Sequence, residues 1–273
     1  MSTLELIPGA RWRPSPFVLG SMALHVLAVA AFVAEPQWWP QLLLLLVADH
    51  LVLTLCGLLP RSDWLGPNLT RLPPAAAARS EVAITIDDGP DPLVTPAVLD
   101  LLDRRGAKAT FFCIGERAAR HPALCREIVR RGHEIGNHSQ HHRHFFSFMG
   151  PARLRLELRQ AQETLAAITG RRPRFFRAPA GLRNPLLDPV LPGLGLRLAS
   201  WTRRGFDTRT ADPQVLLDRL ARNLAGGDVL LLHDGNCTRT ATGEPVVLPV
   251  LERLLDLFEA RGLRAVTLSQ AHT

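Results

Sequence analysis

The chain has 273 residues, 47% of them hydrophobic, and this composition excludes a disordered polar chain. At roughly 100–200 residues per domain, the length allows one large domain or two small ones. The 32 basic residues outnumber the 25 acidic ones, but no nucleic-acid-binding motif accompanies them, so we expect no nucleic-acid partner.

Two long apolar runs dominate the first part of the chain, at about 17–34 and 42–59. Each has the length of a membrane-spanning helix. The short loop between them contains two prolines, and its Trp38 and Trp39 suit a membrane–water interface. We therefore predict a two-helix transmembrane hairpin over residues 1–60, which would make the protein multi-pass in a cell (inner or plasma) membrane. The alternative is a pair of helices buried in a soluble core.

Three ionisable residues, His25, Asp49 and His50, fall inside these apolar runs. Ionisable groups within a membrane span often mark a functional site, because their burial in lipid is costly. Hydrogen bonds between the two helices explain them more simply. We expect that structural role rather than chemistry.

The charges that flank the hairpin predict its orientation. Four arginines flank the two apolar runs, and the loop between the runs has no basic residue; the four are Arg11, Arg13, Arg61 and Arg71. Under the positive-inside rule, this asymmetry places both ends of the hairpin in the cytoplasm. The rest of the chain would then lie on the cytoplasmic side. Long domains cross membranes despite such charges, so the opposite side stays open.

After a Pro- and Ala-rich linker over 61–80, the residues 81–273 alternate between two patterns. Short apolar runs typical of buried strands cover 82–86, 109–114, 174–178, 196–201, 228–233 and 264–268. Amphipathic stretches of helical period cover 95–105, 116–131, 152–169, 212–225 and 245–260. This alternation predicts a parallel α/β sheet. Residues 81–273 form a short segment for eight strand–helix units, so we expect a distorted, incomplete (β/α) barrel. No glycine-rich phosphate loop is present, so we expect no nucleotide cofactor.

Polar groups follow the strand runs at several points. They are Asp87 and Asp88 after 82–86, His138 and His142 after a short run at 133–135, Arg177 within 174–178, Asp207 after 196–201, and His233 at the end of 228–233. The carboxyl ends of parallel strands meet at one edge of a sheet, so these side chains are expected to gather there.

Two of these motifs fit a metal site. His138 and His142 are four residues apart, which would place both imidazoles on one face of a helical turn, and a carboxylate would complete an Asp-His-His set. The adjacent Asp87 and Asp88 allow one carboxylate to bind the metal and the other to act as a base. A turn cap at Asp-Gly-Pro and a histidine-rich surface loop are the plainer alternatives.

In order along the chain, the motifs TIDDGP, NHSQHH, RAPAG, an Asp after a Trp-containing strand, and LLHD resemble those of the NodB-homology polysaccharide deacetylases, carbohydrate esterase family 4. The resemblance covers about 81–270 and marks 81–273 as the deacetylase domain. It implies removal of N-acetyl groups from amino sugars of a polysaccharide or a lipid-linked glycan, with a divalent metal, usually Zn²⁺ and sometimes Co²⁺ or Ni²⁺.

The resemblance also implies residue roles. It makes Asp87 the general base, His233 the general acid, and Arg177 the residue that orients Asp87, with Asp207 supporting either Arg177 or His233. The implied metal ligands are Asp88, His138 and His142, and a backbone N–H near Ala180 and Gly181 would hold the oxyanion.

Two positions depart from the family pattern. Ala180 and Thr208 stand where members often carry aromatic residues that line the sugar groove. These two positions leave the identity of the glycan substrate open, and two alternative functions remain. One is a deformylase or other deacylase of a lipid-linked amino sugar, and the other is a catalytically silent carbohydrate-binding member.

Overall fold

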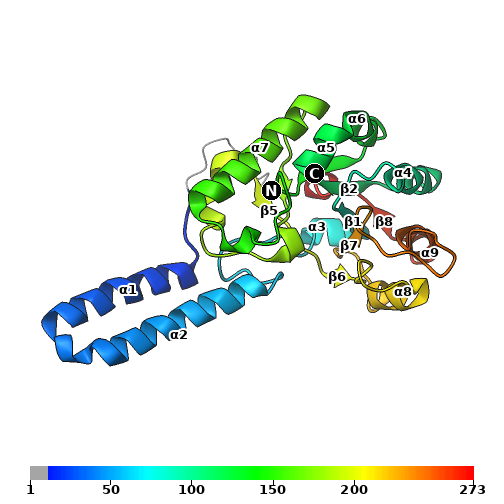
Figure 1. The fold of residues 1–273 in the computed structure, drawn as a ribbon. Helices are drawn as coiled ribbons and strands as arrows, with labels where there is room; N and C mark the ends of the chain where they lie inside the picture. The colour runs from blue at the N-terminus through cyan, green and yellow to red at the C-terminus, as the bar shows by residue number, and fades with distance from the viewer. Residues whose placement is uncertain (1–11) are drawn as a thin grey trace.

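The computed structural model of the chain describes residues 12–273, so Arg11 of the flanking set lies outside the described residues. Two helices, α1 (Pro16–Ala34) and α2 (Trp39–Leu58), form an arm that points away from an α/β domain (Figure 1). The 3₁₀ helix η1 (Pro36–Trp38) joins them at the predicted proline turn. Both are long and apolar enough to cross a membrane, and most of their large apolar side chains are exposed, unlike those of core helices in a soluble domain.

The ionisable residues of the arm connect its two helices. The Ser21 hydroxyl of α1 donates to Asp49 Oδ2 of α2 at 2.6 Å, and the rings of His25 and His50 lie 5.1 Å apart. These contacts fit the expected structural role, because each polar group finds its partner within the hairpin.

The domain is built on a curled sheet of eight strands, all parallel. The strands are β1 (Glu81–Asp87), β2 (Ala109–Cys113), β3 (Glu134–Asn137), β4 (Phe175–Phe176), β5 (Arg197–Leu198), β6 (Arg203–Arg204), β7 (Val229–His233) and β8 (Arg264–Ala265). Their order is β5-β4-β3-β2-β1-β7-β6, with β8 pairing the start of β1. The sheet does not close into a full circle of eight regular strands, so the predicted incomplete (β/α) barrel is confirmed.

Helices cover the outside of this sheet (Figure 1). They are α4 (Thr95–Arg104), α5 (Gly115–Arg120), α6 (Pro122–Arg130), α7 (Pro151–Thr169), α8 (Pro213–Ala221) and α9 (Val247–Ala260). Alternate residues of β1 divide between two apolar cores: Ile84 and Ile86 pack against the helices, and Ala83 packs inside the curl with Phe112 and Val229. This alternation fixes the register of the central strand and the position of its last residue, Asp87.

Three local features differ from the sequence expectations. The predicted helix 116–131 is two helices, α5 and α6, because Pro122 cannot continue the helix that precedes it. Strand β6 was not among the predicted strands, because its two residues are too few to show a period in the sequence. The predicted linker 61–80 packs on the domain: it contains the short helix α3 (Pro74–Ala78), and the Leu69 N–H donates to Leu198 O at 3.0 Å.

Candidate active site

The site forms where the central strands end. Asp87 closes β1 and His233 closes β7, and the two residues are directly paired in the parallel register. His138 directly follows β3, and Arg177 directly follows β4, which pairs with β3. Strand order therefore brings together side chains that lie up to about 150 residues apart in the sequence, as the strand-end argument predicts.

Asp88, His138 and His142 converge on one point. Asp88 Oδ1 lies 3.2 Å from His138 Nε2 and 3.2 Å from His142 Nε2, and the three ligand atoms lie within 4.8 Å of one another. Asp88 Oδ1 is buried and has no hydrogen-bond partner among the described residues. A buried carboxylate oxygen without a partner is costly, and a cation bound by it and the two imidazoles would remove that cost. The residues thus fit a divalent metal.

Different contacts make the His138 and His142 imidazoles suitable as metal ligands. His138 Nδ1 lies 2.8 Å from the Arg177 carbonyl oxygen; an N–H there donates to the oxygen and leaves the Nε2 lone pair facing Asp88. Burial, and then the charge of His138, lowers the pKa of His142 to about 4, so this imidazole is neutral at neutral pH, as a metal ligand must be.

The carboxylate ligand stays ionised although it is buried. Burial raises the pKa of Asp88, but the nearby His138 imidazole, together with the charges of His233 and His142, outweighs burial and holds that pKa well below its ordinary value. Burial likewise lowers the pKa of His138, and the charges of Asp87 and Asp88 raise it above the ordinary value. A bound cation would displace the proton that these carboxylates otherwise favour.

The histidines do not reach this position from a helical turn. Residues 138–142 form a loop in which Ser139 and His142 have φ values of 61° and 50°, in the left-handed region. The His138 and His142 rings nevertheless lie 4.8 Å apart. The structure therefore brings the predicted pair together, but the helical turn that we expected between them is wrong.

Two residues that the sequence did not single out hold Asp88. Asn236 Nδ2 donates to Asp88 Oδ2 at 3.0 Å, which leaves Oδ1 for the metal. Arg117 Nη1 donates to the Asp88 carbonyl at 2.8 Å, and its Nη2 donates to Asn236 Oδ1 at 3.1 Å. These contacts span 29 to 148 positions in the sequence, so local pattern gives no signal for them.

We expect Asn236→Gly to weaken metal binding by at least about tenfold, because partners that orient a ligand are worth that much in metal affinity. Glycine is the chosen replacement because Asn236 has φ 66°, which glycine adopts without strain. Competition with a metal indicator measures the affinity. Asn223→Gly is the matched control, since Asn223 also has a positive φ, 54°, and lies in the loop after α8. An unchanged affinity for Asn236→Gly would contradict this role.

Asp87 is held by a buried arginine. Arg177 Nη1 donates to Asp87 Oδ1 at 2.7 Å and to Thr85 Oγ1 at 2.8 Å, and Nη2 donates to the Ser200 carbonyl at 2.7 Å. The guanidinium carbon also lies 4.2 Å from the centre of the Phe112 ring. Arg177 is therefore fixed on several sides and fixes one oxygen of Asp87, as a residue that orients a base would do.

Asp207 contacts His233 and not Arg177, which resolves the choice that the sequence left open. His233 Nδ1 lies 2.8 Å from Asp207 Oδ1, and the His233 backbone N–H donates to Asp207 Oδ2 at 2.7 Å. Burial lowers the pKa of His233, but Asp207, followed by Asp87 and Asp88, raises it to about 9. The imidazolium is therefore the main form at neutral pH, which suits a proton donor.

The loop that contains Ala180 and Gly181 forms the short helix η3 (Pro179–Gly181). The Gly181 N–H donates to Ala178 O at 2.8 Å, so it is already used. The Ala180 N–H has no acceptor among the described residues, and Ala180 is exposed with φ 55°. Of the two predicted oxyanion residues, Ala180 is the one with a free donor.

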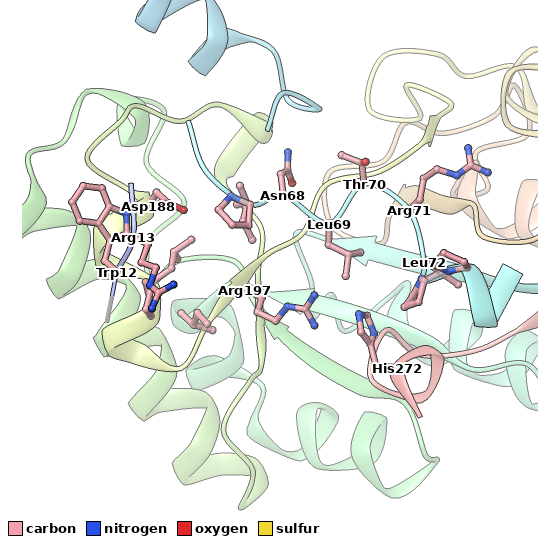
Figure 2. A pocket seen from close by; sticks show the side chains of 17 residues that line it. Trp12, Arg13, Asn68, Leu69, Thr70, Arg71, Leu72, Asp188, Arg197 and His272 are labelled. Carbon is pink, nitrogen blue, oxygen red and sulfur yellow. Dashed lines mark hydrogen bonds between the residues drawn. The ribbon is translucent and has the colours of Figure 1, made fainter. Parts of the chain in front are cut away.

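A cavity of about 720 Å³ lies apart from these groups (Figure 2). It runs between the packed segment around Asn68 and Leu72 and the residues near Arg197, with Trp12 at one end and His272 at the other. None of the strand-end residues described above lines it. The size of this cavity therefore does not mark the position of the candidate active site.

The comparisons with known proteins agree with the geometry. Residues 75–199 match the family model for polysaccharide deacetylase. A peptidoglycan-N-acetylglucosamine deacetylase of Bacillus cereus is 34% identical over 191 residues, which are 69% of this chain and 86% of that protein. A chitooligosaccharide deacetylase of Azorhizobium caulinodans is 35% identical over 191 residues, 67% of this chain and 90% of that protein. The solved structure of a family 4 carbohydrate esterase from Streptomyces lividans, in complex with acetate, matches with a TM-score of 0.61 and 31% identity, over 68% of this chain and 91% of that one.

Proposed function

The chain belongs to the polysaccharide deacetylase family, and on that basis we propose that it is a membrane-anchored, metal-dependent hydrolase that removes N-acetyl groups from the amino sugars of a glycan. The observation that carries the proposal is the convergence at the strand ends. A buried carboxylate oxygen without a partner faces two imidazoles, and next to them lie Asp87, held by Arg177, and His233, held by Asp207.

The metal would be held by Asp88, His138 and His142. Two imidazole nitrogens and one carboxylate oxygen suit zinc best, with cobalt or nickel as alternatives. A cation in that place supplies Lewis acidity, which polarises the acetyl carbonyl and lowers the pKa of a nearby water.

The protein's own groups move the protons. Asp87 accepts a proton from the attacking water, while its other oxygen stays bonded to Arg177. His233 gives its proton to the sugar nitrogen as the carbon–nitrogen bond breaks, and Asp207 holds the imidazole through Nδ1. The free Ala180 N–H donates to the oxyanion. Water and amide thus become acetic acid and the free amine, and Asp87 and His233 return to their starting forms when the proton on Asp87 passes back to His233 through solvent; the acetic acid then ionises to acetate.

The complete set of groups argues against a catalytically silent carbohydrate-binding member, which would lack the base or a ligand. The remaining alternative, a deformylase of a lipid-linked amino sugar, differs in the acyl group released. The test is to incubate metal-loaded protein with N-acetylglucosamine oligomers and with N-formylated analogues and to assay acetate and formate separately. Acetate release supports the proposal, whereas release of formate alone would replace it with the deformylase.

Membrane anchoring is supported by the hairpin. Its large apolar side chains are exposed on both helices, among them Leu19, Val26, Leu44 and Leu51, which are 52%, 69%, 71% and 60% exposed. A lipid bilayer would cover them at no cost in unsatisfied backbone groups, since both segments are helical. The partners of the protein are then the bilayer and the glycan.

We expect the domain to lie on the cytoplasmic side, because Arg13, Arg61 and Arg71 flank the hairpin and the loop between its helices has no basic residue. Reporter fusions at Thr273 measure this sidedness. A cytoplasmic reporter should be active there and alkaline phosphatase silent. The reverse pattern would place the domain outside, where a wall or extracellular polysaccharide would be the substrate.

A further inference from the structure

The end of the membrane hairpin is joined directly to the active-site side of the domain. Helix α2 ends at Leu58, and Pro60 follows within about 7 Å, the reach of two extended residues. The Pro60 carbonyl accepts a hydrogen bond from Ser200 Oγ at 2.6 Å. On each side of this exit, the Gly57 carbonyl accepts from the Arg183 N–H at 3.1 Å and the Ser62 carbonyl accepts from Arg183 Nη2 at 2.5 Å. No free tether separates the arm from the domain.

These contacts continue to the candidate base. Ser200, which donates to Pro60, also accepts a hydrogen bond at its carbonyl from Arg177, and Arg177 binds Asp87. Three hydrogen bonds therefore connect the first residues after the span to the carboxylate that would take the water proton. The catalytic groups are held at a fixed, short distance from the point where α2 ends.

The loop of the oxyanion donor rests on the same junction. A Cβ placed on Gly181 would lie 2.8 Å from Pro60 Cβ and 2.5 Å from Trp201 Cη2, so the glycine is packed tightly between them. Arg183, two residues further on, is only 5% exposed and lies between the hairpin end and this loop. The hairpin end thus forms one wall of the catalytic region.

Exposed apolar side chains surround this junction. We call them the apolar rim: Leu59, Trp64, Phe148 and Leu186, which are 60%, 56%, 85% and 45% exposed. Trp64 packs on Phe17 at the start of α1, with ring centroids 5.2 Å apart. Asn184 Nδ2 bonds the carbonyls of Ser147 and Met149 and so ties the loop of Leu186 to that of Phe148. Clustered exposed apolar groups mark a contact surface, and their continuity with the hairpin identifies the bilayer as that surface.

Resting on the proposed deacetylase function, we propose that the active site opens at the bilayer surface and acts on an amino sugar carried on a membrane lipid. The arm holds the active site next to the membrane. A glycan that extends far from the membrane would therefore have to fold back to reach the site. A sugar on a lipid carrier is confined to the layer in which the site is held, and this confinement raises its effective concentration there.

The length of the link between lipid and sugar tests this placement. Full-length protein in lipid vesicles is given an N-acetylglucosamine oligomer attached to a lipid directly or through a flexible spacer of about 50 Å, and acetate release is measured. We expect the directly attached sugar to react at least about fivefold faster, because a long spacer dilutes the sugar away from the surface. Reaction of the spacer substrate alone, or equal rates, would overturn the proposal. The soluble oligomer tests the chemistry separately: acetate from none of the three would overturn the deacetylase function itself.

The apolar rim provides a second test. Phe148→Ser with Leu186→Ser should slow release from the directly attached substrate by several-fold and leave release from the soluble oligomer unchanged. Val215→Ser is the matched control, since Val215 is 37% exposed on α8, away from the arm (Figure 1). If the rim variant and the control behave alike on the lipid-attached substrate, the rim does not lie in the bilayer and the proposed opening of the site is wrong.

Discussion

Asp87→Asn is expected to abolish deacetylation while keeping the bound metal, and Asp88→Asn is expected to remove both. The two substitutions make the same chemical change at neighbouring residues. Asp88 Oδ1 faces His138 and His142, so loss of its charge removes a ligand. Asp87 Oδ1 is bonded to Arg177 instead, so its replacement removes the base, which is worth about 10²–10⁴ in rate.

Metal content by mass spectrometry and acetate release measure the two effects on the same samples. Asparagine is chosen at position 88 because Asp88 has φ 71°, a conformation that asparagine tolerates. Asp218→Asn, at an exposed position on α8, is the matched control and should change neither quantity. Loss of metal from Asp87→Asn, with retention in Asp88→Asn, would reverse the roles assigned to the two carboxylates.

His233→Asn is expected to lower the rate by about 10²–10⁴, the contribution of a positioned general acid. In the unaltered protein, kcat/KM should fall on the alkaline side with an apparent pKa of about 9, because the imidazolium loses its proton there. The carboxylate of Asp207 is the main group that raises this pKa against burial. Asp207→Asn removes that charge, so the alkaline limb should move to lower pH.

A pH–rate profile of each variant checks the assignment. Asp212→Asn is the control, because Asp212 caps α8 through Gln214 and Val215, and asparagine caps a helix equally well. The alkaline limb of the Asp212→Asn profile should stay at the same pH as in the unaltered protein. An alkaline limb that is unchanged in Asp207→Asn, or still present in His233→Asn, would show that another group donates the proton.

The sequence predicted the sheet and most of the site because both depend on local pattern. Apolar runs gave the strands, and polar groups at their ends gave Asp87, His138, Arg177 and His233, which parallel pairing then brought together. Helix capping is equally local: Asp212 Oδ1 accepts from the Gln214 N–H at 2.8 Å, two residues along the chain, and so caps α8.

The contacts that the sequence did not predict are long-range or depend on backbone conformation. The left-handed residues Ser139 and His142 replace the helical turn expected between the two histidines. The bond from Asn236 to Asp88 joins residues 148 positions apart, and Asp207 reaches His233 only because β6 lies beside β7. The packing of Pro60 on the catalytic loop is of the same kind, because this last residue of the predicted hairpin bonds to Ser200, 140 positions away in the sequence.

Acetate release as a function of zinc added to metal-depleted, full-length protein tests the central claim most directly. With N-acetylglucosamine oligomers as substrate, release should begin only as zinc is added and should reach its plateau at about one equivalent per chain, because Asp88, His138 and His142 form one site. Acetate release that is undiminished without metal, or absent at every zinc level, would contradict a metal-dependent deacetylase.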